Sequence, residues 1–170
     1  SKNLGISGWR IGFIISSPEI NKQILKLNQH IITCAPTILS MYVDKYYEKI
    51  YKNTKKQIIV LLKKRIIIQK YLKKINLKFL SGDSTFYFFI SIERFIGTDL
   101  DFSNYLLYNH KISVVPGSAY GVSTNRYIRV SFGTETVDSI KNALDKIKTV
   151  INIKKINRVE LEKKIKIWTF

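Results

Sequence analysis

The stretch Asn125-Arg126-Tyr127-Ile128-Arg129-Val130-Ser131-Phe132-Gly133 alternates polar or aromatic residues with purely apolar ones. Successive side chains of a β-strand point to opposite sides of the sheet, so Tyr127, Arg129 and Ser131 should share one face. The apolar residues between them should share the other face and pack against a core. This alternation predicts a strand over 127–132 that buries one face and places Arg129 on the opposite one.

The segments around this strand predict a compact α/β layer, in which helices cover a small sheet. Extended segments are predicted at 77–80, 85–92 and 112–115, turns at 81–84 and 116–118, and helices at 102–109 and from a cap at 134–136 to about residue 151. Asp99 or Asp101 is expected to cap the first of these helices. Arg126 is interpreted as an exposed loop residue.

The first 75 residues are expected to be mainly helical. Residues 9–16 are apolar and β-branched and predict a buried strand, after which Ser17 and Pro18 suit the start of a helix that ends near residue 30. Residues 37–75 contain neither Gly nor Pro and keep apolar residues at helical spacing. This pattern predicts either one long helix or two stacked ones. A continuous helix of this length should bridge two bodies or break near Asn53-Thr54.

Length and composition indicate a globular protein. The chain has 170 residues, of which 45% are hydrophobic, enough to fill a core. No run approaches the roughly 20 apolar residues that span a bilayer, and the start does not resemble a secretion signal, so a cytoplasmic location and no membrane partner are expected. The single cysteine, Cys34, cannot form an internal disulfide and is expected to be buried, and no metal-ligand spacing occurs.

The formal net charge of +17 raises the alternative of a nucleic-acid partner. The basic residues are mostly lysines and are distributed over the whole chain instead of forming one cluster. The densest runs, such as Lys63-Lys64-Arg65, alternate with isoleucine and leucine, which is typical of the solvated face of a helix. Nucleic-acid binding is therefore the less favoured interpretation.

Four local sequences together carry a family resemblance. They are Ser1-Lys2-Asn3-Leu4-Gly5-Ile6-Ser7-Gly8-Trp9-Arg10-Ile11-Gly12, Ser81-Gly82-Asp83-Ser84-Thr85-Phe86-Tyr87-Phe88-Phe89, Val114-Val115-Pro116-Gly117-Ser118-Ala119-Tyr120-Gly121, and the strand over 125–133. In this order they resemble the class I and II pyridoxal-phosphate-dependent aminotransferases of the aspartate aminotransferase type, in their C-terminal portion. The resemblance implies that Lys2 binds the cofactor covalently, that Arg10 binds its phosphate, and that Arg129 binds the α-carboxylate of the substrate.

The chemistry of these residue types agrees with such roles. A lysine amine attacks an aldehyde only when it has lost its proton, which a water-excluding pocket favours. A guanidinium matches a phosphate or a carboxylate through paired, charge-assisted hydrogen bonds. Glycines such as Gly5, Gly8 and Gly12 let the backbone approach a cofactor closely. Each motif alone also fits an ordinary turn or buried strand, so the order of the four carries the inference.

The resemblance implies a fragment of fold type I, an α/β pyridoxal-phosphate transferase fold. Residues 1–35 are expected to be a remnant of the large cofactor-binding domain, 36–75 a long interdomain helix, 76–153 a small C-terminal α/β domain, and 154–170 a basic tail. Residues that stack on the cofactor ring and pair with its nitrogen are expected to precede Ser1.

The implied activity is transfer of an amino group between an amino acid and a 2-oxo acid, by an enzyme that is a homodimer when complete. The fragment alone is expected to be inactive. Lyase and decarboxylase reactions share the fold and stay open as alternatives. A second hypothesis is a truncated, non-catalytic remnant that serves only as a folding or interaction module.

Overall fold

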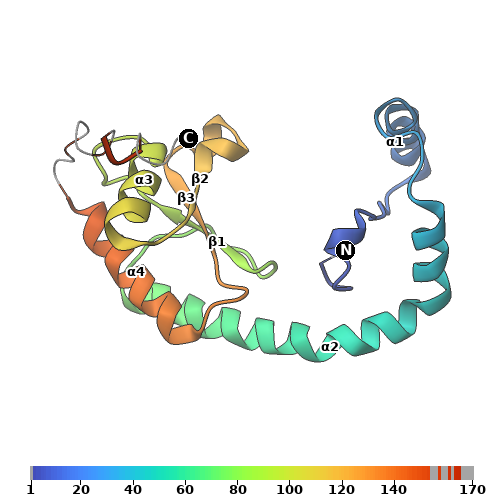
Figure 1. Ribbon diagram of the computed structural model, residues 1–170, viewed down its shortest axis with the longest axis horizontal. Coiled ribbons are helices and arrows are strands. Elements are labelled where there is room, and N and C mark those ends of the chain that lie inside the picture. The colour runs from blue at the N-terminus through green and yellow to red at the C-terminus, as the bar shows by residue number, and fades with distance from the viewer. Residues whose placement is uncertain (1, 154–156, 158–160, 162, 166–170) are drawn as a thin grey trace. The chain divides into compact units, whose positions relative to one another are not determined.

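The computed structural model describes residues 2–153, 157, 161 and 163–165. The chain divides into two compact units, Ser1–Val60 and Leu61–Phe170. One helix, α2 (Thr37–Lys74), begins in the first unit and ends in the second (Figure 1). The two units are described separately below.

The second unit contains a three-stranded antiparallel sheet. Its strands are β1 (Tyr87–Ser91), β2 (Val115–Pro116) and β3 (Tyr127–Ser131), in the order β1-β3-β2. Arg129 lies opposite Phe89 on one side and Val115 on the other. The strand predicted over 127–132 is therefore confirmed, and it occupies the centre of the sheet.

Helices cover the apolar face of this sheet. They are the end of α2, α3 (Asp99–His110) and α4 (Val137–Ile151). Ile90 and Ile128 from the strands and Leu144 from α4 are completely inaccessible to solvent and belong to one core. The opposite face carries Arg129. The predicted α/β layer is thus present, although the segment predicted at 112–115 has only Val115 within β2, because the preceding residues join no ladder.

The start of α3 differs from the prediction. Its N-cap is Thr98, whose hydroxyl accepts a hydrogen bond from the Asp101 amide at 3.0 Å. The Asp101 carboxylate accepts one from the Thr98 amide at 3.1 Å, which completes a capping box. Asp101 is therefore the reciprocal partner of the cap, and Asp99 has a separate partner described below.

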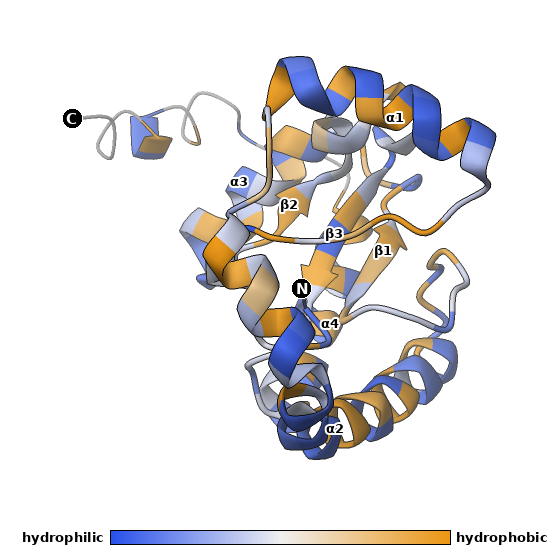
Figure 2. Ribbon diagram, turned by 90° about the vertical axis from the view of Figure 1, so that its right-hand side faces the viewer, coloured by the Kyte–Doolittle hydropathy of each residue, from blue (hydrophilic) through white to orange (hydrophobic). Residues whose placement is uncertain are grey.

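The first unit contains a 3-10 turn, η1 (Ser7–Trp9), the helix α1 (Pro18–Ile31) and the start of α2. The helix after Pro18 is confirmed, and Ser17 is its N-cap by position, without a side-chain hydrogen bond. None of the α1 residues is buried, and Figure 2 shows hydrophobic residues along it. Cys34 is exposed, so its predicted burial is wrong: the loop that carries it packs no core around it.

The buried strand predicted over 9–16 does not form. Its first residue, Trp9, belongs to η1, and Phe13 and Ile15 are 62% and 88% exposed. A strand needs a neighbour for its backbone hydrogen bonds, and no described residue pairs with this segment. The apolar sequence alone could not supply that partner.

Helical structure predicted over 37–75 is present as α2, but a kink at Tyr46 divides it into two helical segments. It stays helical across Asn53 and Thr54. The irregular residue is Tyr46 instead, with φ −118° and ψ 16°. Of the two alternatives, the helix therefore continues from one unit into the other. The predicted tail, 154–170, lies mostly outside the described residues, and the assignment of the chain to domains of a larger enzyme stays a prediction.

We expect a hydrogen bond between α2 and α4 to make the free energy of unfolding fall as the pH rises into the alkaline range. The Tyr71 hydroxyl donates to the Asp145 carboxylate, whose oxygens lie 2.8 and 2.7 Å away, and this bond raises the pKa of Tyr71. The bond stabilises the fold below the pKa of an unfolded tyrosine, about 10, and its contribution is lost as the pH rises through the raised folded value. In urea unfolding between pH 8 and pH 11, Tyr71→Phe should therefore lose less stability than the wild type.

Tyr108→Phe is the matched control, since no described residue hydrogen-bonds the Tyr108 hydroxyl. It should retain the alkaline slope of the wild type. Equal slopes for Tyr71→Phe and the wild type would contradict the assigned bond.

Candidate active site

The turn that carries Lys2 is fixed to α2. The Gly5 amide donates to the Lys2 carbonyl at 3.3 Å, and the Thr54 hydroxyl donates to the Asn3 carbonyl at 2.8 Å. Gly5 has φ +68°, and a Cβ there would lie 3.3 Å from the Thr54 methyl group. A glycine is therefore favoured both by the left-handed backbone and by the close approach of α2.

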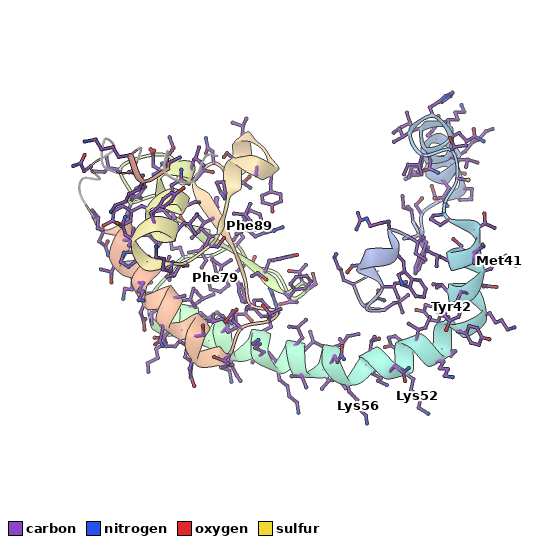
Figure 3. All side chains as sticks on the ribbon, in the orientation of Figure 1. Met41, Tyr42, Lys52, Lys56, Phe79 and Phe89 are labelled. Atoms are coloured by element: carbon purple, nitrogen blue, oxygen red, sulfur yellow. The ribbon has the colours of Figure 1, made fainter. Side chains whose placement is uncertain are left out.

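Apolar contacts complete the attachment of this turn. Leu4 and Ile6 are buried against Val43 of α2. The Trp9 ring meets the Tyr42 ring edge-on at 5.6 Å, and Figure 3 marks Tyr42 on α2. Leu4 and Ile6 thus anchor the segment that follows Lys2, while the Lys2 side chain itself is exposed.

Arg10 lies at the end of η1 in a left-handed conformation, with φ 56° and ψ 34°. Its side chain is exposed, and its Nη1 donates to the Ser7 carbonyl at 3.0 Å. No described residue forms a salt bridge with Arg10. The guanidinium therefore retains donors for an anion, as phosphate binding requires.

Arg129 lies between aromatic rings on the open face of the sheet. Its guanidinium carbon is 4.2 Å from the centre of the Tyr87 ring and 4.9 Å from that of Tyr120. Tyr120 also meets the Phe89 ring edge-on at 5.4 Å, and Figure 3 marks Phe89 on β1. The cation therefore lies over two tyrosine rings, and its buried Nε has no acceptor among the described residues.

Tyr120 is positioned by a compact loop formed by η2 (Gly117–Tyr120) and η3 (Val122–Thr124). A Cβ on Gly117 would lie 2.0 Å from the Thr124 carbonyl oxygen, so only glycine fits. The Thr124 hydroxyl donates to the Gly117 carbonyl at 2.7 Å. The loop is closed tightly enough to fix the direction of the Tyr120 side chain.

Asp99 joins this loop to α3. It is buried, and one of its carboxylate oxygens accepts a hydrogen bond from the Ser118 amide at 2.6 Å. The sequence indicated only a helix cap at this position. Its partner lies 19 residues later in the chain, which no local pattern reveals.

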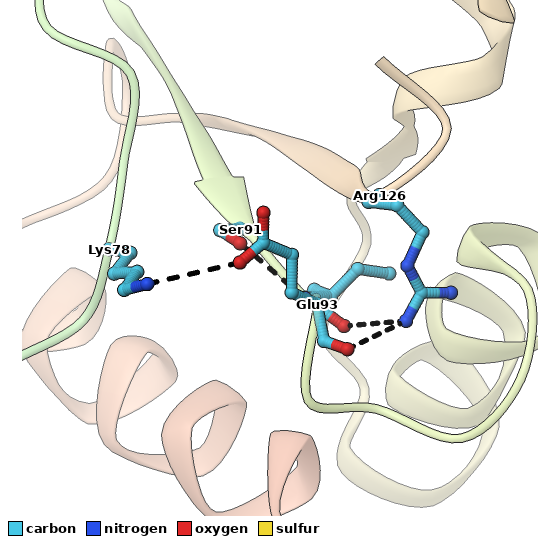
Figure 4. Close-up of polar contacts among 5 residues, drawn as sticks. Lys78, Ser91, Glu93 and Arg126 are labelled. Atoms are coloured by element: carbon cyan, nitrogen blue, oxygen red, sulfur yellow. Dashed lines mark hydrogen bonds and ion pairs between the residues drawn. The ribbon is translucent and has the colours of Figure 1, made fainter. Parts of the chain in front are cut away.

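Arg126 is not the exposed loop residue that the sequence suggested. It is half-buried, and Figure 4 shows its guanidinium directed at backbone carbonyls of the loop after β1. The acceptors are the carbonyls of Gly97 at 2.8 Å, Ile92 at 3.2 Å, Glu93 at 3.0 Å and Phe95 at 2.7 Å. One arginine therefore holds the loop that leads into α3 against the start of β3.

Arg65, on α2, is a second internal arginine, with only 5% of its surface exposed. Burial lowers the pKa of its guanidinium, and the carboxylate of Asp83 opposes that shift. Its donors reach backbone carbonyls of the segment before β1. The sequence placed Arg65 in a basic run interpreted as the solvated face of a helix. For Arg65 that interpretation is wrong, because its side chain is buried.

The residues expected to act together fall in two parts of the structure. Lys2 and Arg10 lie on one short segment of the first unit, and Arg129 lies on the sheet of the second. No described group of His, Cys, Asp and Glu side chains could hold a metal ion. Among the described helices, none is long and apolar enough to cross a membrane.

Comparison with known proteins identifies the family. The model of the family described as aminotransferase class I and II matches residues 1–147. The chain belongs to the class I and II aminotransferases. Its similarity to solved aminotransferases extends to the fold: an aromatic aminotransferase from Pyrococcus horikoshii superposes with a TM-score of 0.69 at 26% identity, over 89% of this chain and 41% of that one. The expected fold, a fragment of fold type I, is confirmed.

Two curated aminotransferases illustrate the sequence similarity. A (5-formylfuran-3-yl)methyl phosphate transaminase from Methanocaldococcus jannaschii is 32% identical over 157 residues, which cover 89% of this chain and 40% of that protein. An aspartate aminotransferase from Thermotoga maritima is 28% identical over 152 residues, covering 89% and 38%. The chain thus spans about 40% of the length of the curated aminotransferases it matches.

Removal of the Arg126 clamp should destabilise the second unit. In Arg126→Met, the carbonyls of Phe95 and Gly97 lose the Arg126 donor. Carbonyls left without a partner typically cost about 1–3 kcal/mol of unfolding free energy. Urea denaturation of the two proteins measures this difference.

Arg94→Met is the matched control, because Arg94 lies within the same loop and its side chain is exposed. It should change stability by less than about 0.5 kcal/mol. Equal stabilities of Arg126→Met and Arg94→Met would show that the four carbonyl contacts do not stabilise the fold.

Proposed function

We propose that the complete protein containing this chain is a pyridoxal-phosphate-dependent aminotransferase, which transfers an amino group between an amino acid and a 2-oxo acid. The observation that carries the proposal is Arg129. Its cation lies on the open sheet face of an aminotransferase chain, two tyrosine rings lie against it, and its Nε has no protein acceptor among the described residues. An unpaired guanidinium of this kind suits a carboxylate, which both substrates possess.

Arg129 would orient the substrate through its α-carboxylate. A guanidinium and a carboxylate pair in one plane through two parallel hydrogen bonds, which fixes direction as well as distance. Tyr87 and Tyr120 lie against this cation and support its position. The carboxylate is thereby held at one end of the substrate while the bonds at its α-carbon react.

Lys2 and Arg10 fit the cofactor that the family implies. An exposed amine and an exposed guanidinium with free donors, eight residues apart on one anchored segment, match an aldehyde and a phosphate of one molecule. Pyridoxal phosphate, when bound, supplies the electron sink that stabilises negative charge at the substrate α-carbon. Lys2 would carry the cofactor and then move a proton at that carbon as general base and acid.

The Lys2 amine must be shielded from water, and the described residues do not shield it. An amine accepts a proton only in its uncharged form, which exclusion of water favours, and Lys2 is exposed. The rest of the complete protein would therefore exclude water from Lys2. It would also bury the exposed side chains of Phe13, Ile15 and Ile38, in the interior or at the subunit contact of a homodimeric enzyme of the cytoplasm.

Trapping of the cofactor tests the role of Lys2. The complete protein is incubated with pyridoxal phosphate, and borohydride reduction then locks the cofactor onto the amine that carries it. Peptide mass spectrometry should find the label on the peptide that contains Lys2, and Lys2→Ala should lose it. Lys22→Ala, which removes an exposed lysine of α1, should keep the label in full.

The same protein tests the reaction. With an amino acid and a 2-oxo acid, it should form the 2-oxo acid that corresponds to the donor, and Lys2→Ala should reduce this rate by at least about a hundredfold. Label on other lysines in Lys2→Ala, or an undiminished rate, would refute the assignment. Release of carbon dioxide instead would indicate decarboxylase chemistry.

A further inference from the structure

We infer that Arg65 is a positioning residue of the Arg129 site: from α2 it fixes the backbone before β1 and thereby holds the Tyr87 ring against the Arg129 guanidinium. The inference rests on the proposed function of Arg129. It concerns a residue that touches neither substrate nor cofactor. All of the groups involved belong to the second unit.

Arg65 binds three carbonyls of one short segment. Its Nη1 donates to the carbonyls of Thr85 at 3.2 Å and Tyr87 at 3.1 Å, and its Nη2 donates to that of Gly82. The acceptors lie 17 to 22 residues after Arg65 in the chain. A single side chain of α2 therefore fixes the path of the segment from Gly82 to Tyr87.

This segment needs such support because it contains an unfavourable backbone conformation. Thr85 has φ +68°, a left-handed conformation that is uncommon for a β-branched residue. Strain of this kind persists only where the surroundings determine the conformation. Two hydrogen bonds hold Thr85 in this conformation. One runs from Arg65 to the Thr85 carbonyl, and the other from the Tyr87 amide to the Thr85 hydroxyl at 3.3 Å.

Tyr87 connects the clamp to the site. Its carbonyl accepts from Arg65, while its ring centre lies 4.2 Å from the Arg129 guanidinium carbon. A shift of the start of β1 would therefore move the ring that lies against Arg129. No other tyrosine among the described residues is bonded to Arg65 in this way.

The packing around Arg65 suits a planar cation. Its guanidinium carbon lies 4.4 Å from the centre of the Phe88 ring and 5.9 Å from that of Phe132. Its Nε is buried without a partner among the described residues. Burial of a charge costs free energy, and the planar guanidinium offsets this cost by donating hydrogen bonds to three carbonyls. Lysine offers the charge without the planar fork.

Nuclear magnetic resonance of the complete protein containing this chain tests the inference through the Arg129 Nε–Hε signal. The Tyr87 ring shifts this signal by its ring current, and Tyr87→Leu measures the size of that contribution. Arg65→Met should lose at least half of it. In a titration with pyruvate followed at the same signal, Arg65→Met should bind roughly threefold to fivefold more weakly, the loss expected for a weakened cation–π contact.

Arg94→Met is the control, because it also replaces an arginine of this unit by methionine, and it should change neither the shift nor the affinity. Arg65→Lys should lose part of the shift, since the ammonium cannot reach all three carbonyls. An Arg129 shift and an affinity in Arg65→Met equal to those of Arg94→Met would overturn the inference.

Two further results keep the test decisive. If Arg65→Met and Arg65→Lys do not fold, the wild type still decides: the Arg65 guanidinium should rotate and exchange with solvent much more slowly than that of Arg94, and equal rates would overturn the clamp. If pyruvate leaves the wild-type Arg129 signal unchanged, the proposed carboxylate role fails. The ring-current comparison then still decides whether Arg65 positions Tyr87.

Discussion

The placement of Arg129 depends on the burial of the opposite face of its own strand. Ile128 is fully buried and Val130 nearly so, which commits β3 to one register against the helices. A shift of one residue would exchange the two faces and place the guanidinium in the apolar core. Because that alternative buries an unpaired charge, the core and the cation favour the same register. The chemistry of the open face is thus set by packing on the other face.

Three arginines of the second unit have different roles. Arg65 binds carbonyls before β1 and at its first residue, and Arg126 binds carbonyls after β1. Arg129, between aromatic rings, keeps donors for a ligand. In a chain with a net charge of +17, these side chains are distinguished by burial and partners and not by charge. The planar fork with several donors explains why arginine occupies these positions in a chain whose other cations are mostly lysines.

The sequence predicted those features that depend on local periodicity. The alternation over 127–132 and the helical spacing over 37–75 each report one element's own burial pattern, and both were confirmed. It failed where the outcome depends on a distant partner. The strand over 9–16 found no pairing segment among the described residues, and the acceptors of Arg126 lie 29 to 34 residues upstream. The roles of Lys2 and Arg10 rest on family membership, which their motif indicated but which local physics alone did not.

The most direct test of the account is a crystal structure of the complete protein with bound pyruvate. The account predicts that both carboxylate oxygens lie within hydrogen-bond distance of the Arg129 guanidinium, in its plane, with Tyr87 and Tyr120 still in contact with this cation. Pyruvate bound at another cation, or Arg129 paired with a protein carboxylate on the same face, would contradict the central claim that this strand presents its arginine to a substrate.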